Sequence, residues 1–102
     1  MGKKVIILDF TDCKYIMDFY ERIRKAFGFS KEYNMSLDGL WDMMTTDCDA
    51  DELIIRGEKT LPKDLYEYAQ RYHTIYDDFV KERERRCRTY SGFKPFSYTV
   101  ED

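Results

Sequence analysis

The sequence predicts a single α/β domain in which a small, mostly parallel sheet of three strands is covered by helices. Its 102 residues accommodate one domain, which we take to span residues 1–102. Hydrophobic residues make up 43% and aromatic residues 17%, enough to form a core and to exclude a disordered chain. Short apolar runs typical of strands alternate with helical patterns in the order β-α-α-β-α-β. That order is typical of strands joined by helices.

The chain opens with a predicted strand over Lys3–Asp9, followed by a helix. Val5–Leu8 is an unbroken apolar run, which predicts a strand covered on both faces. The next segment repeats apolar residues at helical spacing. We expect Asp12 to cap the start of this helix and Gly28 to end it. Its apolar positions are Ile16, Phe19, Tyr20, Ile23, Ala26 and Phe27.

A loop over Phe29–Met35 leads to a second, shorter helix. Ser36 is a good N-cap for this helix, which we expect to run to about Thr46. Asp47–Asp51 has the composition of a turn. Glu52–Gly57 then predicts a second short strand that a glycine closes.

The longest predicted element is a helix that opens at Thr60-Leu61-Pro62, because proline is tolerated only in the first turn of a helix. Apolar residues recur every three or four positions as far as Val80, and no Gly or Pro interrupts the segment before Gly92. The tail alternates apolar with other residues, which predicts a last strand at the sheet edge. The alternating positions are Phe96, Tyr98 and Val100.

Charge is distributed unevenly along the chain. The net charge of −3 argues against a generic nucleic-acid binder, which would be basic. Residues 29–53 hold one cation and seven anions, a local charge of −6, whereas the basic run, residues 81–94, has a local charge of +4. Cations near a helix C-terminus complement the helix dipole, and alternating charges are typical of a solvated face. Contact with RNA or phosphate is the alternative for the basic run.

The second helix places an aromatic side chain beside two carboxylates. Its buried stripe, at positions i, i+3, i+4 and i+7, consists of Leu37, Leu40, Trp41 and Met44. At about 100° per residue, Asp38, Asp42 and Thr45 cluster on one side of this stripe, with Trp41 at the border; we call this surface the acidic flank. The helix dipole explains Asp38, but like charges at i, i+4 cost a helix about 0.2–0.5 kcal/mol. The pair therefore favours a cationic partner, and a solvated acidic face is the alternative.

Other chemistries find little support in the sequence. Asp47, Asp49 and Asp51 resemble the start of a calcium-binding loop, but Glu52 occupies the position that requires glycine. The three cysteines have no metal-ligand spacing, and we expect His73 to be a surface or boundary residue, so no metal site is expected. A nucleophile motif and a glycine-rich phosphate loop are both missing. We therefore expect neither an enzyme nor a cofactor.

Cysteine usage and hydropathy favour a cytoplasmic location. An odd number of cysteines without a dense framework differs from a small secreted, disulfide-stapled domain. The apolar run Val5–Leu8 is too short for a signal-peptide core, and no segment approaches the roughly twenty apolar residues of a membrane span.

The acidic flank lies within a segment that resembles a known family. Residues 33–42 read YNMSLDGLWD, and the L-D-x-L-W-D core resembles the signature of the barstar family, intracellular inhibitors of a secreted bacterial ribonuclease. The β-α-α-β start has matching spacing, so the resemblance covers roughly the first 57 residues. It implies a barstar-like fold and a non-enzymatic protein that blocks the nuclease active site with the second helix and its preceding loop.

The resemblance also implies roles for individual residues. Asp42 would take the place of the RNA phosphate, Asp38 would pair with an arginine, and Trp41 would lie at the edge of the contact. An acidic surface of this kind complements a basic RNA-binding cleft and speeds association. The partner is then a ribonuclease or related nuclease toxin, with no membrane and no direct nucleic-acid contact. The implied partner-binding residues are Tyr33, Asn34, Ser36, Asp38, Trp41, Asp42, Thr45 and Glu82.

Several positions depart from the family pattern. Glu32 stands where the family has the first of two loop tyrosines, Asn34 replaces a loop glycine, and Ser36 replaces an asparagine. One long helix takes the place of two, and the tail is longer and more basic. These differences favour a different nuclease or toxin as the target. The alternatives are a barstar-fold interaction module or immunity protein for another nuclease toxin, and an RNA-associated regulator that uses residues 81–94.

Overall fold

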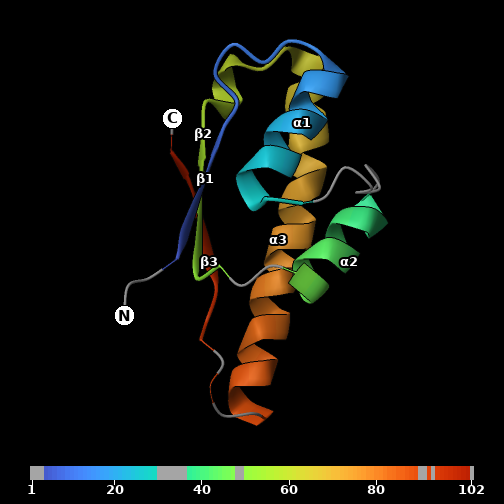
Figure 1. Ribbon diagram of the computed structural model, residues 1–102. Coiled ribbons are helices and arrows are strands. Elements are labelled where there is room, and N and C mark those ends of the chain that lie inside the picture. The colour runs from blue at the N-terminus through green and yellow to red at the C-terminus, as the bar shows by residue number, and fades with distance from the viewer. Residues whose placement is uncertain (1–3, 30–36, 48–49, 90–91, 93, 102) are drawn as a thin grey trace.

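The computed structural model describes residues 4–29, 37–47, 50–89, 92 and 94–101 (Figure 1). The predicted order β-α-α-β-α-β is confirmed, with one additional 3-10 turn, η1, between the second strand and the last helix. In chain order the elements are β1 (Val5–Asp9), α1 (Ile16–Phe27), α2 (Leu37–Asp47), β2 (Glu52–Arg56), η1 (Glu58–Thr60), α3 (Lys63–Thr89) and β3 (Ser97–Glu101).

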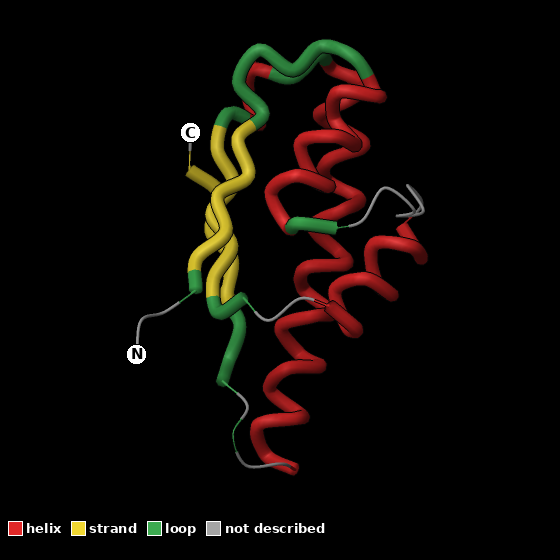
Figure 2. Tube along the Cα trace, in the orientation of Figure 1, coloured by secondary structure: helices red, strands yellow, loops and turns green. Residues whose placement is uncertain are grey.

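The three strands form one parallel sheet with β2 in the centre. Ile7 of β1 lies opposite Ile54 of β2, which lies opposite Thr99 of β3. The sequence therefore predicted the fold class and the place of the last strand correctly. All three helices lie on the same side of this sheet (Figure 2).

The sheet is covered on one face only by the described part of the chain. Along β1, Ile6 and Leu8 are buried, whereas 41% of Val5 and 49% of Ile7 is exposed. The prediction of a strand covered on both faces is therefore wrong. An unbroken apolar run does not show whether a strand has a second layer behind it, and here the helices pack on the face that contains Ile6 and Leu8.

The first helix ends as predicted but begins later. Gly28 adopts a left-handed conformation with φ of 75° and caps the helix C-terminus, a role that favours glycine. The prediction that Asp12 caps the N-terminus is wrong, because the N-cap position is Tyr15. Asp12 instead lies in the preceding turn with φ of 66°, a conformation that Asp tolerates better than most residues.

Aromatic side chains fill the layer between the sheet and the helices. Phe10 and Phe19 stack with ring centroids 4.8 Å apart, and Tyr72 of α3 meets Phe19 edge-on.

The predicted single long helix is confirmed, since α3 is continuous over 27 residues. No helix in the described ranges is long and apolar enough to cross a membrane.

Candidate functional site

The α2 helix is held by its apolar stripe. Leu40 and Met44 are fully buried, as predicted. Trp41 is half-buried and meets Phe79 of α3 edge-on, with ring centroids 6.5 Å apart and an interplanar angle of 86°. These contacts fix the orientation of α2 against α3, so the opposite side of α2 is presented in a defined direction.

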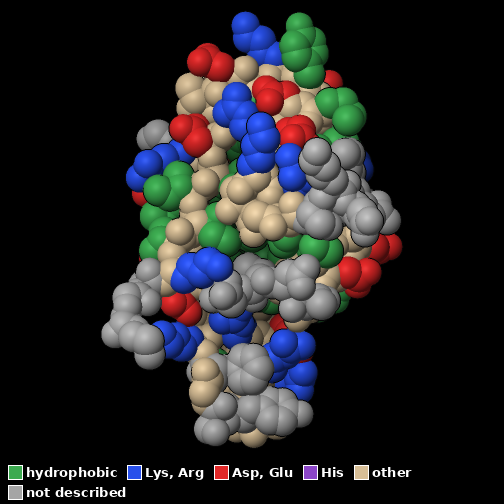
Figure 3. Space-filling model, viewed as in Figure 1, with side chains coloured by type: hydrophobic (Ala, Val, Ile, Leu, Met, Phe, Trp, Pro, Cys, Tyr) green, Lys and Arg blue, Asp and Glu red, His purple; other side chains and the backbone are tan. Residues whose placement is uncertain are grey.

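The acidic flank faces outward from this anchored helix. Asp38 and Asp42 are exposed, and Asp and Glu side chains gather over α2 in Figure 3. Thr45 is half-buried, and its hydroxyl donates to the backbone carbonyls of Trp41 (3.0 Å) and Asp42 (3.2 Å). Residues 37–47 contain no Lys or Arg, so the two carboxylates meet no cation of their own helix. Tyr33, Asn34 and Ser36 lie outside the described residues.

The remaining candidate, Glu82, belongs to a charged cluster on α3. Its carboxylate accepts hydrogen bonds from Arg85 (Nη2, 2.6 Å; Nε, 3.1 Å) and from Arg86 (Nε, 3.1 Å). Hydrogen bonding to Arg85, followed by the attraction of that guanidinium, lowers the pKa of Glu82. At about 100° per residue, Glu82 and Arg86 lie within about 60° of Phe79 around the helix axis. Glu82 and Arg86 therefore lie toward the side of α3 on which Phe79 meets Trp41, whereas Arg85 is about 120° away from Phe79 and exposed.

Arg83 differs from the other described residues of the basic run because it is buried. Only 7% of the residue is exposed, its guanidinium lies 5.1 Å from the centroid of the Phe79 ring, and Nη1 donates to the Lys94 carbonyl (3.1 Å). The interpretation of the basic run as a solvated face is therefore wrong for Arg83. Its position one turn after Phe79 places it on the packed side of α3. RNA contact by the run stays a prediction, for which exposed Lys81 and Arg88 are available.

A buried polar cluster forms between η1 and α3 that the sequence patterns did not predict. Glu58, at 2% exposure, accepts a hydrogen bond from Gln70 Nε2 (3.1 Å) and lies 2.6 Å from His73 Nε2. The spacing of Gln70 and His73 along one helix face was available from the sequence. Their common partner depends on how η1 folds against α3. The cluster fixes the chain between β2 and α3, a structural task.

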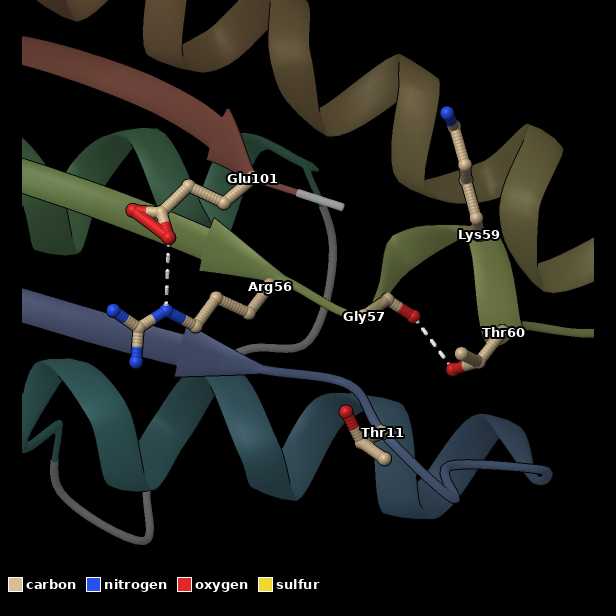
Figure 4. Close-up of a pocket in the computed structure, with 6 residues that line it drawn as sticks. All are labelled: Thr11, Arg56, Gly57, Lys59, Thr60 and Glu101. Carbon is tan, nitrogen blue, oxygen red and sulfur yellow. Dashed lines mark hydrogen bonds and ion pairs between the residues drawn. The ribbon is translucent and has the colours of Figure 1, made fainter.

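A hollow of about 400 Å³ lies at the carboxyl ends of the strands (Figure 4). Here Arg56 Nε pairs with Glu101 Oε1 (3.2 Å), and the Lys59 side chain points away from the other labelled residues. Gly57 is required at this place because its φ is 74° and a Cβ would lie 2.7 Å from the Thr11 nitrogen. Ligands often bind at such strand ends. The described residues, however, include no group of three or more His, Cys, Asp or Glu side chains that could hold a metal ion.

Comparison with known proteins relates most of the chain, up to the end of α3, to one family. The family model described as barstar (barnase inhibitor) matches residues 3–92. The match extends well beyond the first 57 residues and includes α2 and α3. No curated protein matches the sequence significantly.

Proposed function

The chain belongs to the barstar (barnase inhibitor) family, and from this premise we propose that it inhibits a barnase-like ribonuclease. In this proposal α2 and its preceding loop block the nuclease active site, and the chain itself carries out no catalysis. The same role defines an antitoxin or immunity protein, which must act in the cytoplasm where an active nuclease would reach cellular RNA.

One observation carries the proposal: Asp38 and Asp42 are both exposed on a helix that Leu40, Met44 and the Trp41–Phe79 contact hold in place. A ribonuclease binds a polyanion, so its active site presents cationic groups that carboxylates can also satisfy. Because the two carboxylates are on a packed helix, they lose little freedom on binding. We assign the phosphate-mimicking role to Asp42 and a neighbouring arginine contact to Asp38.

The proposal also assigns partner contacts to further residues. Thr45 belongs to the acidic flank, toward the carboxyl end of α2, and Tyr33, Asn34 and Ser36 precede this helix in the sequence. Glu82 is an outer contact whose charge Arg85 and Arg86 already compensate. The local charge of −6 over residues 29–53 would attract a basic nuclease and raise the association rate.

Inhibition of a small, secreted, guanyl-preferring bacterial ribonuclease tests the proposal. The wild-type chain is compared with Asp42→Ala and with Asp64→Ala, which removes an exposed carboxylate from the first turn of α3. We expect tight inhibition by the wild type and by Asp64→Ala, and its loss in Asp42→Ala. Inhibition that Asp42→Ala retains would contradict the assigned role, and no inhibition by the wild type would contradict a barnase-like target.

A further inference from the structure

The edge strand β3 directs backbone hydrogen-bonding groups away from the sheet. The Ser97 N–H donates to the Asp51 carbonyl across the β2 side (3.2 Å). Since alternate residues of a parallel strand bond to the same neighbour, Thr99 and Glu101 also face β2, whereas Tyr98 and Val100 direct their N–H and C=O groups outward. In the part of the chain that the structure describes, no strand pairs with this edge.

The inner, apolar face of the sheet is also partly exposed at this edge in the described part of the chain. Val100 is in register with Ile55 and Leu8, which are fully buried, yet 36% of Val100 is exposed. Beside the start of β3, α3 leaves an open groove of about 500 Å³. The groove is lined by Asp77, Val80, Lys81, Glu84, Ser97 and Tyr98. The described helices therefore leave part of β3 exposed on this face.

We propose that β3 pairs with β3 of a second copy of this chain, antiparallel, about a two-fold axis at Thr99. This alignment pairs all five residues of each strand and places Tyr98 opposite Val100 of the second copy. The outward groups of Tyr98 and Val100 are then a hydrogen-bonded pair, which the two-fold axis repeats. The result is a continuous six-stranded sheet with one antiparallel seam, an arrangement common in mixed sheets.

Side chains and charges fit this seam. On the inner face, Val100 of the second copy lies beside Tyr98 and next to the groove, an aromatic and β-branched pair of the kind that stabilises neighbouring strands. The Tyr98 hydroxyl donates to Asp77 Oδ1 (2.7 Å), which fixes this ring at the groove wall. Glu101, which pairs with Arg56 of its own copy, lies opposite Ser97 of the second copy, so the two Glu101 side chains do not face each other. Lys94 precedes β3, so Glu101 of each copy also lies within about 10 Å of Lys94 of the other copy, a distance of one Debye length.

The proposed pairing is independent of the nuclease inhibitor proposal. Asp77, which bonds to Tyr98, lies about 160° around α3 from Phe79, which contacts Trp41 of α2. The acidic flank thus stays exposed in the paired form. Strands of five residues span only about 17 Å, so we expect the pairing to bury less area than a standard interface and to form only at high protein concentration.

Sedimentation equilibrium from about 10 μM to 1 mM tests the pairing with proline as the probe. Val100→Pro removes an outward N–H and no bond within the sheet, so we expect a folded monomer at all concentrations. Ile7→Pro is the matched control, because Ile7 directs its N–H outward at the opposite edge of the sheet. It should dimerise like the wild type. Should Val100→Pro not fold, Val100→Lys replaces it, with the same expected loss of the dimer.

A cysteine placed on the axis provides a second measurement. The two Thr99 residues form a non-hydrogen-bonded pair with Cα atoms about 4.5 Å apart, within the range of a disulfide. With Cys48→Ser and Cys87→Ser in the background, Thr99→Cys should form a linked dimer in oxidised glutathione, and Ile7→Cys should not. A wild type that is monomeric up to 1 mM, a Val100→Pro variant that dimerises, or equal linking of both cysteines would overturn the proposal.

Discussion

The acidic flank of α2 and the basic run at the end of α3 are both highly charged, but they use their charges differently. On α3, Arg85 and Arg86 bond to Glu82, and Arg83 is buried against Phe79. The charges of this region thus hold their own helix and its neighbours together. On α2, the carboxylates are exposed on a helix that contains no cation.

The difference shows that charge density alone does not identify a binding surface. Glu82 and its two arginines are spaced three and four residues apart, where opposite charges stabilise a helix. Asp38 and Asp42 have the same spacing with like charges, which destabilises a helix by about 0.2–0.5 kcal/mol. A region whose charges oppose its own structure is the better candidate for an external partner.

Charge reversal at Asp42, on the acidic flank, should have the largest effect of the changes proposed here. We expect Asp42→Lys to weaken binding to the ribonuclease about a thousandfold or more, because a like charge would then face the cationic site. The size of this expected loss of affinity is taken from charge pairs in a complex of this same family. The measurement is the dissociation constant from calorimetric titration, with Asp64→Lys as the control. Equal losses in the two variants would show that net charge, and not the acidic flank, governs binding.

Truncation of Arg83 should affect stability and not binding. Arg83→Ala removes the guanidinium from the Phe79 ring and leaves the Lys94 carbonyl without its donor, so we expect the free energy of unfolding to fall by about 1–3 kcal/mol. Urea denaturation measures this change. Arg88→Ala, at an exposed position of the same helix, should change stability by less than about 0.5 kcal/mol. Similar stabilities of the two variants would contradict a structural role for Arg83.

Removal of Glu82 should change affinity much less than removal of Asp42. Because Arg85 and Arg86 already compensate its carboxylate, Glu82→Ala should weaken binding no more than about threefold, as expected for a charge at an interface rim. Surface plasmon resonance with immobilised ribonuclease measures the change. A loss as large as that of Asp42→Ala would assign both regions to the nuclease site.

The titration of Glu82 should show the smallest effect. Hydrogen bonding and attraction by Arg85, then Arg86, lower its pKa, so the charged pair contributes to stability above the ordinary pKa of Glu and is lost as pH falls through the lowered value. Side-chain carbonyl NMR should therefore give a titration midpoint below the usual range. In Arg85→Ala the midpoint should rise, and a midpoint that does not move would show that Arg85 is not the cause.

Local patterns predicted much of the fold, and tertiary contacts decided the rest. The spacing of Leu40 and Met44 identified the packed side of α2, and Gly28 identified the end of α1. The burial of Arg83 was not predictable from the basic run, because it depends on Phe79 and on the return of the chain at Lys94. The exposure of Val5 and Ile7 was also not predictable, because it depends on which face of the sheet the described helices cover.

The candidate site was predictable as a pattern on one helix. Helical periodicity alone predicts that Asp38 and Asp42 lie on one side of the apolar stripe. The structure exposes both carboxylates. We propose that Asp42 contributes more than Glu82 to ribonuclease affinity. This difference was not predictable, because it depends on the side-chain conformations of Arg85 and Arg86.

The central claim is that the acidic flank of α2 occupies the substrate site of a ribonuclease. Initial rates of RNA cleavage, measured over a range of RNA and inhibitor concentrations, test it most directly. We predict competitive inhibition, in which the apparent KM for RNA rises with inhibitor concentration, kcat is unchanged, and Asp42→Ala abolishes the rise. With the inhibitor in excess over the enzyme and equilibrated against RNA, inhibition that lowers kcat and leaves KM unchanged would place the contact away from the substrate site and contradict the claim.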